Sequence, residues 1–202
     1  PAYIVAYEQK CRLLKPDAYR MVNLLKCINC NAHAAGGDSG CTRMEIEMKP
    51  ILDACCGSRM FWFDKTNPAA VFMDNRELDD TLCDGRSLQV KPDVVGDFRD
   101  MPFNDETFRL VVFDPPHLLH AGDDSWLAKK YGVLDGSTWR DDIRKGFSEC
   151  MRVLKPFGVL IFKWNEDQVD FRRVKQLFPC APLFGQRRAK TFWIVFMKLD
   201  EK

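Results

Sequence analysis

The chain has 202 residues, of which 46% are hydrophobic and 29% charged. This composition is that of an ordinary globular protein with room for one substantial core. The formal net charge of +1 at pH 7 argues against a protein that coats nucleic acid through a general positive field, although it is compatible with a local basic patch. No run approaches 18 apolar residues, and the first one is too short before Glu8 for a signal peptide. We therefore expect a cytoplasmic protein without a membrane partner.

Residues 1–49 differ in character from the rest and form an N-terminal extension. A helix is predicted to begin near Pro16, and residues 31–40 are small, polar and rich in glycine, as in a loop or linker. Three thiols and an imidazole could form a tetrahedral zinc set of Cys27, Cys30, His33 and Cys41. Cys27 and Cys30 form a CxxC motif, but the spacing after it is compressed and no second CxxC follows. This favours ordinary thiols and no metal. The odd total of nine cysteines without regular spacing also indicates reduced, intracellular thiols.

Residues 50–202 alternate between short apolar runs and longer mixed segments. Five near-continuous apolar runs predict strands buried on both faces; they cover 50–54, 70–74, 93–97, 110–114 and 158–164. Apolar residues recur at helical spacing from Trp139 to Leu154, after Thr138 as N-cap. A further helix is expected over 166–178. The alternation predicts an α/β fold with a mostly parallel sheet.

The last two apolar runs, 181–185 and 191–199, are separated by a short basic turn. So short a connection rules out a parallel crossover between them, and it predicts a C-terminal antiparallel hairpin. The fold class expected for residues 50–202 is therefore a Rossmann-like, seven-stranded, mostly parallel sheet with helices on both faces.

Acidic residues follow three neighbouring predicted strands. Asp53 precedes a turn through Gly57, Asp74 closes the second run, and Asp97 closes the third. A glycine turn lets backbone approach a ligand closely, with the N-terminus of a following helix aimed at it. A single glycine does not match the pyrophosphate fingerprint, which argues against a dinucleotide. The acids suit a ligand with a ribose, an amine and a positive charge.

At these positions the chain resembles a known family. ILDACCGS, VFMDN and VVGDFRDMPFNDETFRLVVFDPP are similar to the first four motifs of the class I S-adenosylmethionine-dependent methyltransferases, in the same order and spacing. The resemblance implies S-adenosylmethionine as cofactor and seven strands with the last inserted antiparallel. It implies that Asp53 and Gly57 hold the methionine part, Asp74 the ribose, and Asp97 with Phe98 the adenine. Cys55, Asn75 and Asp114 complete the expected cofactor contacts.

Asp114, Pro115, Pro116 and His117 follow the fourth strand. The prolines fix the backbone and present carbonyl acceptors without N–H donors. An amino group could donate to the Asp114 carboxylate and to a proline carbonyl, which would position its nitrogen for methyl transfer. The sequence resembles the DPPY motif of amino-methyltransferases, with histidine in place of the aromatic residue. These four residues are the predicted catalytic set.

The segment from 118 to 137 is long for a plain connection, as a lid or a substrate-reading element would be. Trp126 and Tyr131 lie in it, and Lys163 and Trp164 end the fifth strand. These four are candidate substrate contacts. The expected function is methyl transfer to an amino nitrogen of an adenine-type nucleobase in DNA or RNA. A small-molecule or protein side-chain methyltransferase, and a non-catalytic module that binds S-adenosylmethionine, are the alternatives.

Overall fold

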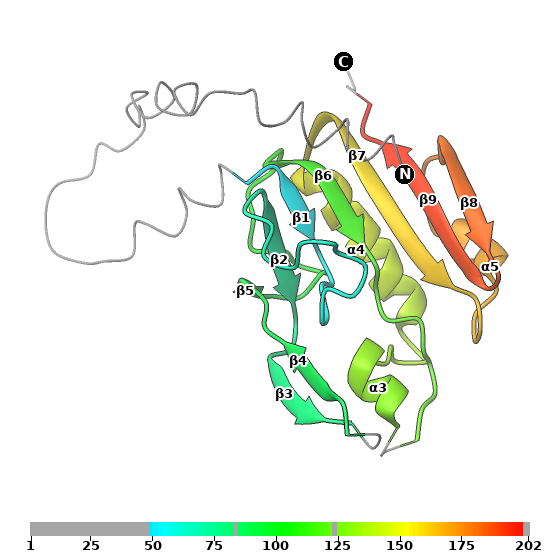
Figure 1. Ribbon diagram of the computed structural model, residues 1–202. Helices are drawn as coiled ribbons and strands as arrows, with labels where there is room; N and C mark the ends of the chain where they lie inside the picture. Colours follow the sequence, from blue (N-terminus) through cyan, green and yellow to red (C-terminus); the bar gives the residue numbers. More distant parts are fainter. Residues whose placement is uncertain (1–48, 83–84, 123–124, 200–202) are drawn as a thin grey trace, which may run out of the picture. The chain divides into compact units, whose positions relative to one another are not determined.

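The computed structural model describes residues 49–82, 85–122 and 125–199. Its main element is a seven-stranded sheet in the order β5-β2-β1-β6-β7-β9-β8 (Figure 1). The strands are β1 Ile51–Asp53, β2 Ala70–Asp74, β5 Val94–Val95, β6 Phe108–Phe113, β7 Leu154–Asn165, β8 Phe184–Arg188 and β9 Thr191–Met197. The five strands β5, β2, β1, β6 and β7 pair with their neighbours in parallel. Strand β9 pairs antiparallel with both β7 and β8. The predicted mostly parallel sheet with its C-terminal hairpin is confirmed.

Two helices cover the same face of this sheet, whereas helices were expected on both faces. The helix α4, Trp139–Val153, places Phe147 edge-on to Phe196 of β9 at 5.0 Å between ring centroids. The short helix α5, Phe171–Lys175, stacks Phe171 on Phe192 of the same strand at 4.4 Å. Alternate residues of a strand point to one face, so Phe192 and Phe196 lie on the same side. The main hydrophobic core fills the space beneath both helices.

Around β1 and β2 the opposite face is covered by the loop 54–69. Its Trp62 ring meets Phe72 of β2 edge-on at 4.9 Å. The helix that we expected to begin at the Gly57 turn does not form, because residues 54–69 adopt a series of turns. The Asp64 carboxylate accepts hydrogen bonds from the backbone N–H and the hydroxyl of Thr66. The side-chain oxygen of Asn67 accepts one from the backbone N–H of Ala69. Such local side-chain bonds compete with helical hydrogen bonding.

The connections at the carboxyl ends of the strands also differ from the prediction. A two-stranded hairpin, β3 Leu78–Thr81 and β4 Ser87–Val90, follows β2 and was not predicted. The segment expected as a loop at 118–137 contains a short helix, α3 Trp126–Tyr131. Lys129 of α3 pairs with Asp80 of β3 at 2.8 Å, so these two insertions lie side by side (Figure 1). Helix α5 is shorter than the predicted 166–178.

None of the helices in the described part of the chain has the length and apolar content needed to cross a bilayer. The N-terminal extension predicted at 1–49, including the zinc set Cys27, Cys30, His33 and Cys41, lies outside the described residues apart from its last position. Among the residues that are described, no cluster of three or more His, Cys, Asp or Glu side chains could hold a metal ion.

Candidate functional site

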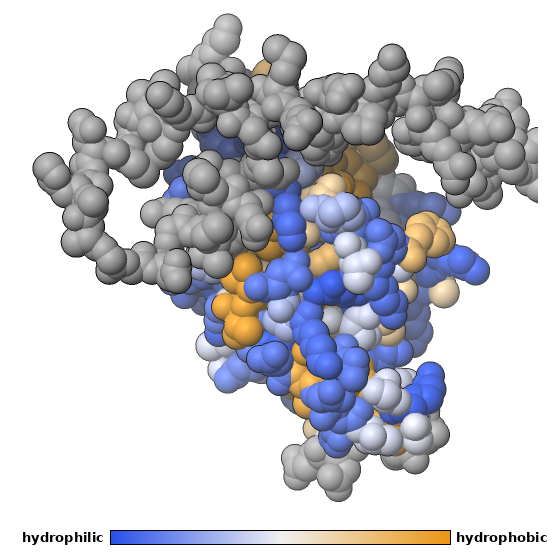
Figure 2. All heavy atoms as spheres, turned by 60° about the vertical axis from the view of Figure 1, so that its left-hand side comes forward, coloured by the Kyte–Doolittle hydropathy of each residue, from blue (hydrophilic) through white to orange (hydrophobic). Residues whose placement is uncertain are grey.

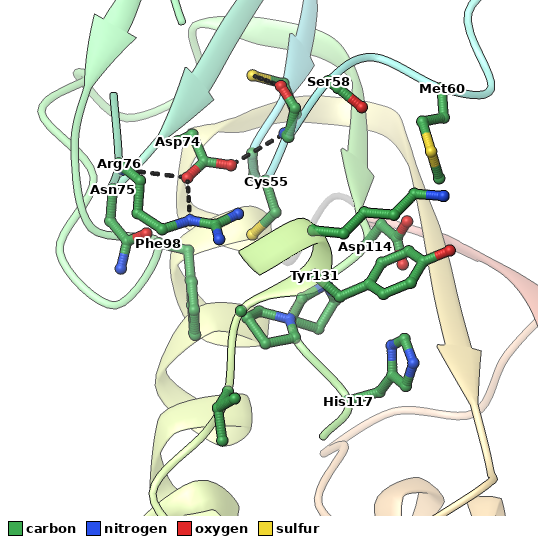
Figure 3. A pocket seen from close by; sticks show the side chains of 18 of the residues that line it. Cys55, Ser58, Met60, Asp74, Asn75, Arg76, Phe98, Asp114, His117 and Tyr131 are labelled. Carbon is green, nitrogen blue, oxygen red and sulfur yellow. Dashed lines mark hydrogen bonds and ion pairs between the residues drawn. The ribbon is translucent and has the colours of Figure 1, made fainter. Parts of the chain in front are cut away.

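A pocket opens at the carboxyl ends of β1, β2 and β6, beneath α3. Most of the residues predicted from the sequence line it: Cys55, Gly57, Asp74, Asn75, Phe98, Asp114, Pro115, Pro116, His117 and Tyr131. Figure 3 shows Asp74, Asn75 and Phe98 at one side and Asp114, His117 and Tyr131 at the other. The two halves of the predicted site, for cofactor and for methyl acceptor, therefore share one cavity.

The carboxylate of Asp74 organises the side of the pocket predicted to hold the cofactor. It is buried, with 5% of its surface exposed, and its Oδ2 accepts the Gly57 backbone N–H at 2.9 Å. Gly57 has a φ of +48°, a conformation that glycine adopts without steric cost. Asp74 thus fixes the turn after β1 from the neighbouring strand, a role the sequence did not indicate.

Arg76 connects Asp74 to the helix above the pocket. Its backbone N–H and its Nε donate to Asp74 Oδ1 at 3.0 and 3.2 Å. Its Nη1 donates to the backbone oxygen of Lys129 in α3 at 3.0 Å. The Arg76 side chain therefore links Asp74, at the end of β2, to α3 above the pocket. Sequence reasoning missed Arg76, and only its position two residues after a rim acid could have suggested it.

Asp53 lies behind the pocket and does not line it. Its side chain is fully buried, Oδ2 accepts the Trp62 indole N–H at 2.7 Å, and Oδ1 accepts the Cys55 backbone N–H at 3.3 Å. Burial raises the pKa of Asp53 to about 7, against the hydrogen bond from Trp62, and the carboxylate of Asp114 adds to the rise. The structure thus places Asp53 as a support for the turn 54–57, behind the residues that line the pocket.

Asp114 forms an ion pair with a lysine of the neighbouring strand β7. Its Oδ2 accepts from Lys163 Nζ of β7, and the two side chains are 17% and 19% exposed. Burial raises the pKa of the Asp114 carboxyl, while the Lys163 ammonium opposes that rise. Within the described chain no donor contacts Oδ1 of Asp114, and this atom is not sealed from solvent. Asp114 therefore retains a free acceptor in the wall of the pocket.

His117 and Tyr131 form an aromatic wall beside Asp114. Their ring centroids are 5.3 Å apart with the planes tilted by 53°, so they contact each other and leave no slot between them. Burial and, to a smaller extent, the nearby Lys163 ammonium lower the pKa of His117 to about 4. The imidazole is therefore neutral at pH 7.

The remaining predicted residues lie elsewhere. Asp97 is outside the lining and is bound by Arg99, which holds its pKa low and also reaches Asp142 of α4. Trp164 is fully buried in the core and donates to the Val169 carbonyl at 2.9 Å. Trp126, at the start of α3, is 38% exposed and does not line the pocket. None of these three residues lines the pocket.

The two cysteines of the turn have no role as nucleophiles. Burial raises the pKa of the Cys55 thiol well above its usual range and that of Cys56 to about 12, and the neighbouring carboxylates add to both shifts. The thiolate is the reactive form of cysteine, and it is not populated at neutral pH here. We therefore assign both side chains to packing around the turn.

No protein-family model matches the chain, and no curated protein matches it in sequence. Similar solved structures include a protein of Pyrococcus horikoshii, 17% identical over 73% of this chain and 80% of the other, with a TM-score of 0.47. A Haemophilus influenzae protein named as a methylase is 15% identical over 78% and 91%, with a TM-score of 0.43. A Methanococcus maripaludis protein named as an S-adenosyl-L-methionine-dependent methyltransferase is 15% identical over 75% and 78%, also at 0.43. Likeness at this level assigns no activity to the chain.

Proposed function

We propose that this chain is an S-adenosylmethionine-dependent methyltransferase that modifies an amino nitrogen, of an adenine-type nucleobase in DNA or RNA. The observation that carries the proposal is the free Oδ1 of Asp114. It lies in the same pocket as the Gly57 turn, Asn75 and Phe98. A carboxylate acceptor, rigid proline carbonyls and an adjoining site for the methyl donor are the parts that amino methylation requires.

The cofactor side of the pocket fits a nucleoside. A carboxylate has about four acceptor positions, and Asp74 accepts three hydrogen bonds here, from Gly57 and Arg76. One position remains for a ribose hydroxyl, and the Asn75 amide lies beside it in the lining. Phe98 offers an apolar ring to a base from the same side (Figure 3). When bound, S-adenosylmethionine supplies a methyl group on a positively charged sulfur that is open to attack by a nitrogen lone pair.

The acceptor side positions the attacking nitrogen. An amino N–H donates to Asp114 Oδ1 and a second one to a proline carbonyl of the rigid turn, which aims the nitrogen lone pair into the pocket. Lys163 pairs with Asp114 and opposes the rise in its pKa that burial causes. In its ionised form the carboxylate stabilises the positive charge that develops on nitrogen. The proton leaves the nitrogen for solvent water after the N–C bond has formed. His117, with its pKa lowered to about 4, is too weak a base to hold that proton.

Transfer of a tritiated methyl group to separate pools of DNA, RNA, protein and small metabolites tests the function. We expect label in a nucleic-acid pool, and at least a hundredfold loss in Asp114→Asn, because an amide presents a weaker acceptor to the developing charge. Asp105→Asn changes an exposed acid outside the pocket and serves as the matched control. Label in the protein or metabolite pool alone would replace the nucleobase with that acceptor. Cofactor binding without any transfer would indicate a binding module.

A further inference from the structure

A second hollow adjoins the pocket and is strongly basic. It is a groove of about 510 Å³ between the loop 57–66, the β3–β4 hairpin and α3. Five cationic side chains line it: Arg59, Lys65, Arg86, Lys91 and Lys130. No carboxylate belongs to the lining within the described residues. Figure 2 brings this side forward and shows hydrophilic residues over much of its described surface. The chain as a whole has a net charge of only +1, so the positive charge is concentrated locally.

Arg59 builds the groove by fixing its two walls. Its guanidinium donates to the backbone oxygens of Lys65 and Lys91 at 2.5 and 2.6 Å and lies 3.8 Å from the centre of the Phe72 ring. It also pairs with Asp93 at 3.2 Å, outside the lining. The loop 57–66 and the strand edge at Lys91 are therefore held at a constant separation.

The lysines of the two walls remain available to a ligand. Lys65 is exposed, and Lys91 is 61% exposed with a 3.4 Å pair to an equally exposed Asp79. A surface pair of this kind contributes little and exchanges readily for another anion. Both lysines bind Arg59 through their backbone oxygens, which Lys65→Ala and Lys91→Ala would retain.

The groove is continuous with the pocket in which methyl transfer would occur. Gly57, Ser58, Met60 and Lys130 line both. S-adenosylmethionine carries no phosphate, so the cofactor does not account for a row of cations beside its site. Anionic groups at successive positions along a polymer would account for it, because lysine and arginine side chains contact the phosphates of nucleic acids.

We propose that this groove binds the phosphodiester backbone of a nucleic-acid strand whose target base enters the pocket at Asp114. The inference rests on the proposed function and adds the surface that holds the substrate. Lys65 and Lys91 contact phosphates from opposite walls, and Met60, which is 48% exposed at the junction, offers an apolar contact to a base. A base in a duplex would have to be flipped out to reach Asp114, so a single strand is the simplest ligand.

Fluorescence anisotropy with labelled 12-nucleotide single strands of DNA and of RNA tests the groove. The double variant Lys65→Ala/Lys91→Ala is compared with Lys145→Ala/Lys175→Ala, which removes the same charge from two exposed lysines of α4 and α5. We expect the first to weaken binding about tenfold or more at low salt. Its slope of log affinity against log salt should fall by about 1.4, since each phosphate contact to a single strand contributes about 0.7.

Equal binding by the two double variants, or no binding by the wild type at low salt, would overturn the proposal. Competition by a mononucleotide at the same concentration as the 12-mer would also overturn it, because it would indicate a site for one phosphate. The two strand types show whether DNA or RNA supplies the backbone. Binding is measured without cofactor, so failure of the proposed function would instead appear as an intact groove that binds strands which receive no methyl group.

Discussion

Each carboxylate at the rim of the sheet is held by different donors, and these donors decide its chemical role. Asp74 is saturated on one oxygen by Arg76 and fixes the glycine turn with the other. Asp53 is buried against Trp62. Asp114 gives one oxygen to Lys163 and keeps the second for a ligand. Three aspartates at equivalent strand ends thus have different roles: Asp74 fixes the glycine turn, Asp53 supports it from behind, and Asp114 keeps an acceptor for a ligand.

His117 should remain neutral across the physiological range. Its pKa is lowered to about 4 by burial and by Lys163, so we expect the titration of its ring, followed by NMR, to have a midpoint near pH 4. The chain has three histidines, and the spectrum of His117→Gln identifies the signal. A midpoint near 6.5 would show that the ring is solvated and that the acceptor side is more open than described.

Asp53 should make stability fall as the pH rises. Its folded-state pKa of about 7 exceeds the value of 3.8 for the free carboxyl, so between these values the folded protein retains a proton that the unfolded chain has lost. Raising the pH through this window costs the folded state up to about 4 kcal/mol. Asp53→Asn has no such group, and its free energy of unfolding in urea should therefore gain on the wild type by up to that amount from pH 4 to pH 8.

The control for this measurement is Asp64→Asn, at an exposed acid whose pKa is lowered by hydrogen bonds from Thr66. Its stability relative to the wild type should not rise with pH. A pH-independent difference between Asp53→Asn and the wild type would contradict the buried, raised-pKa state of Asp53.

At the scale of elements, the central strands follow from the sequence and the insertions do not. All five residues of β2 are buried, as its apolar run predicts for a strand covered on both faces. The β3–β4 hairpin alternates exposed and buried residues only in β4, Ser87–Val90, and β3 has two acids in its four residues. Helix α3 buries none of its residues. Neither β3 nor α3 has an apolar pattern that a sequence could show, because contacts made from other segments hold both.

The cover of the pocket should loosen when Arg76 is removed. Arg76→Ala loses the bonds to Asp74 and to the Lys129 carbonyl, and hydrogen bonds to a charged group contribute about 1.5–3 kcal/mol. We expect amide hydrogen exchange in residues 126–132 to become about tenfold faster or more. Arg144→Ala, at an exposed arginine of α4, should leave this segment unchanged. Unchanged exchange in Arg76→Ala would show that α3 is held by other contacts.

The packing of α4 sets the position of Phe98. A Cβ at Gly146 would lie 2.6 Å from both Phe113 Cζ and Phe98 Cδ2, so Gly146→Ala must displace these rings. We expect a loss of about 1–3 kcal/mol in the free energy of unfolding and weaker cofactor binding, because Phe98 lines the pocket. Ser148→Ala, exposed on the same helix, should change neither. Full stability and affinity in Gly146→Ala would contradict the close packing.

At the scale of the molecule, the site is predictable from the sequence as far as strand ends determine it. Cys55, Gly57, Asp74, Phe98 and Asp114 meet because parallel strands place their carboxyl ends on one edge. The sequence could not show which acids face the cavity, since the rotation of Asp53 toward Trp62 and of Asp97 toward Arg99 depends on partners elsewhere in the chain. Arg76 and the basic groove arise from the same long-range contacts.

Isothermal titration with S-adenosylmethionine tests the central claim most directly, that one pocket at this edge holds the cofactor beside Asp114. The comparison is between wild type, Asp74→Asn and Asp141→Asn, which alters an exposed acid of α4. We expect one site per chain, at least tenfold weaker binding in Asp74→Asn because an amide cannot accept on both sides from Gly57 and Arg76, and unchanged binding in Asp141→Asn. No binding by the wild type, or equal affinity in all three proteins, would contradict the account.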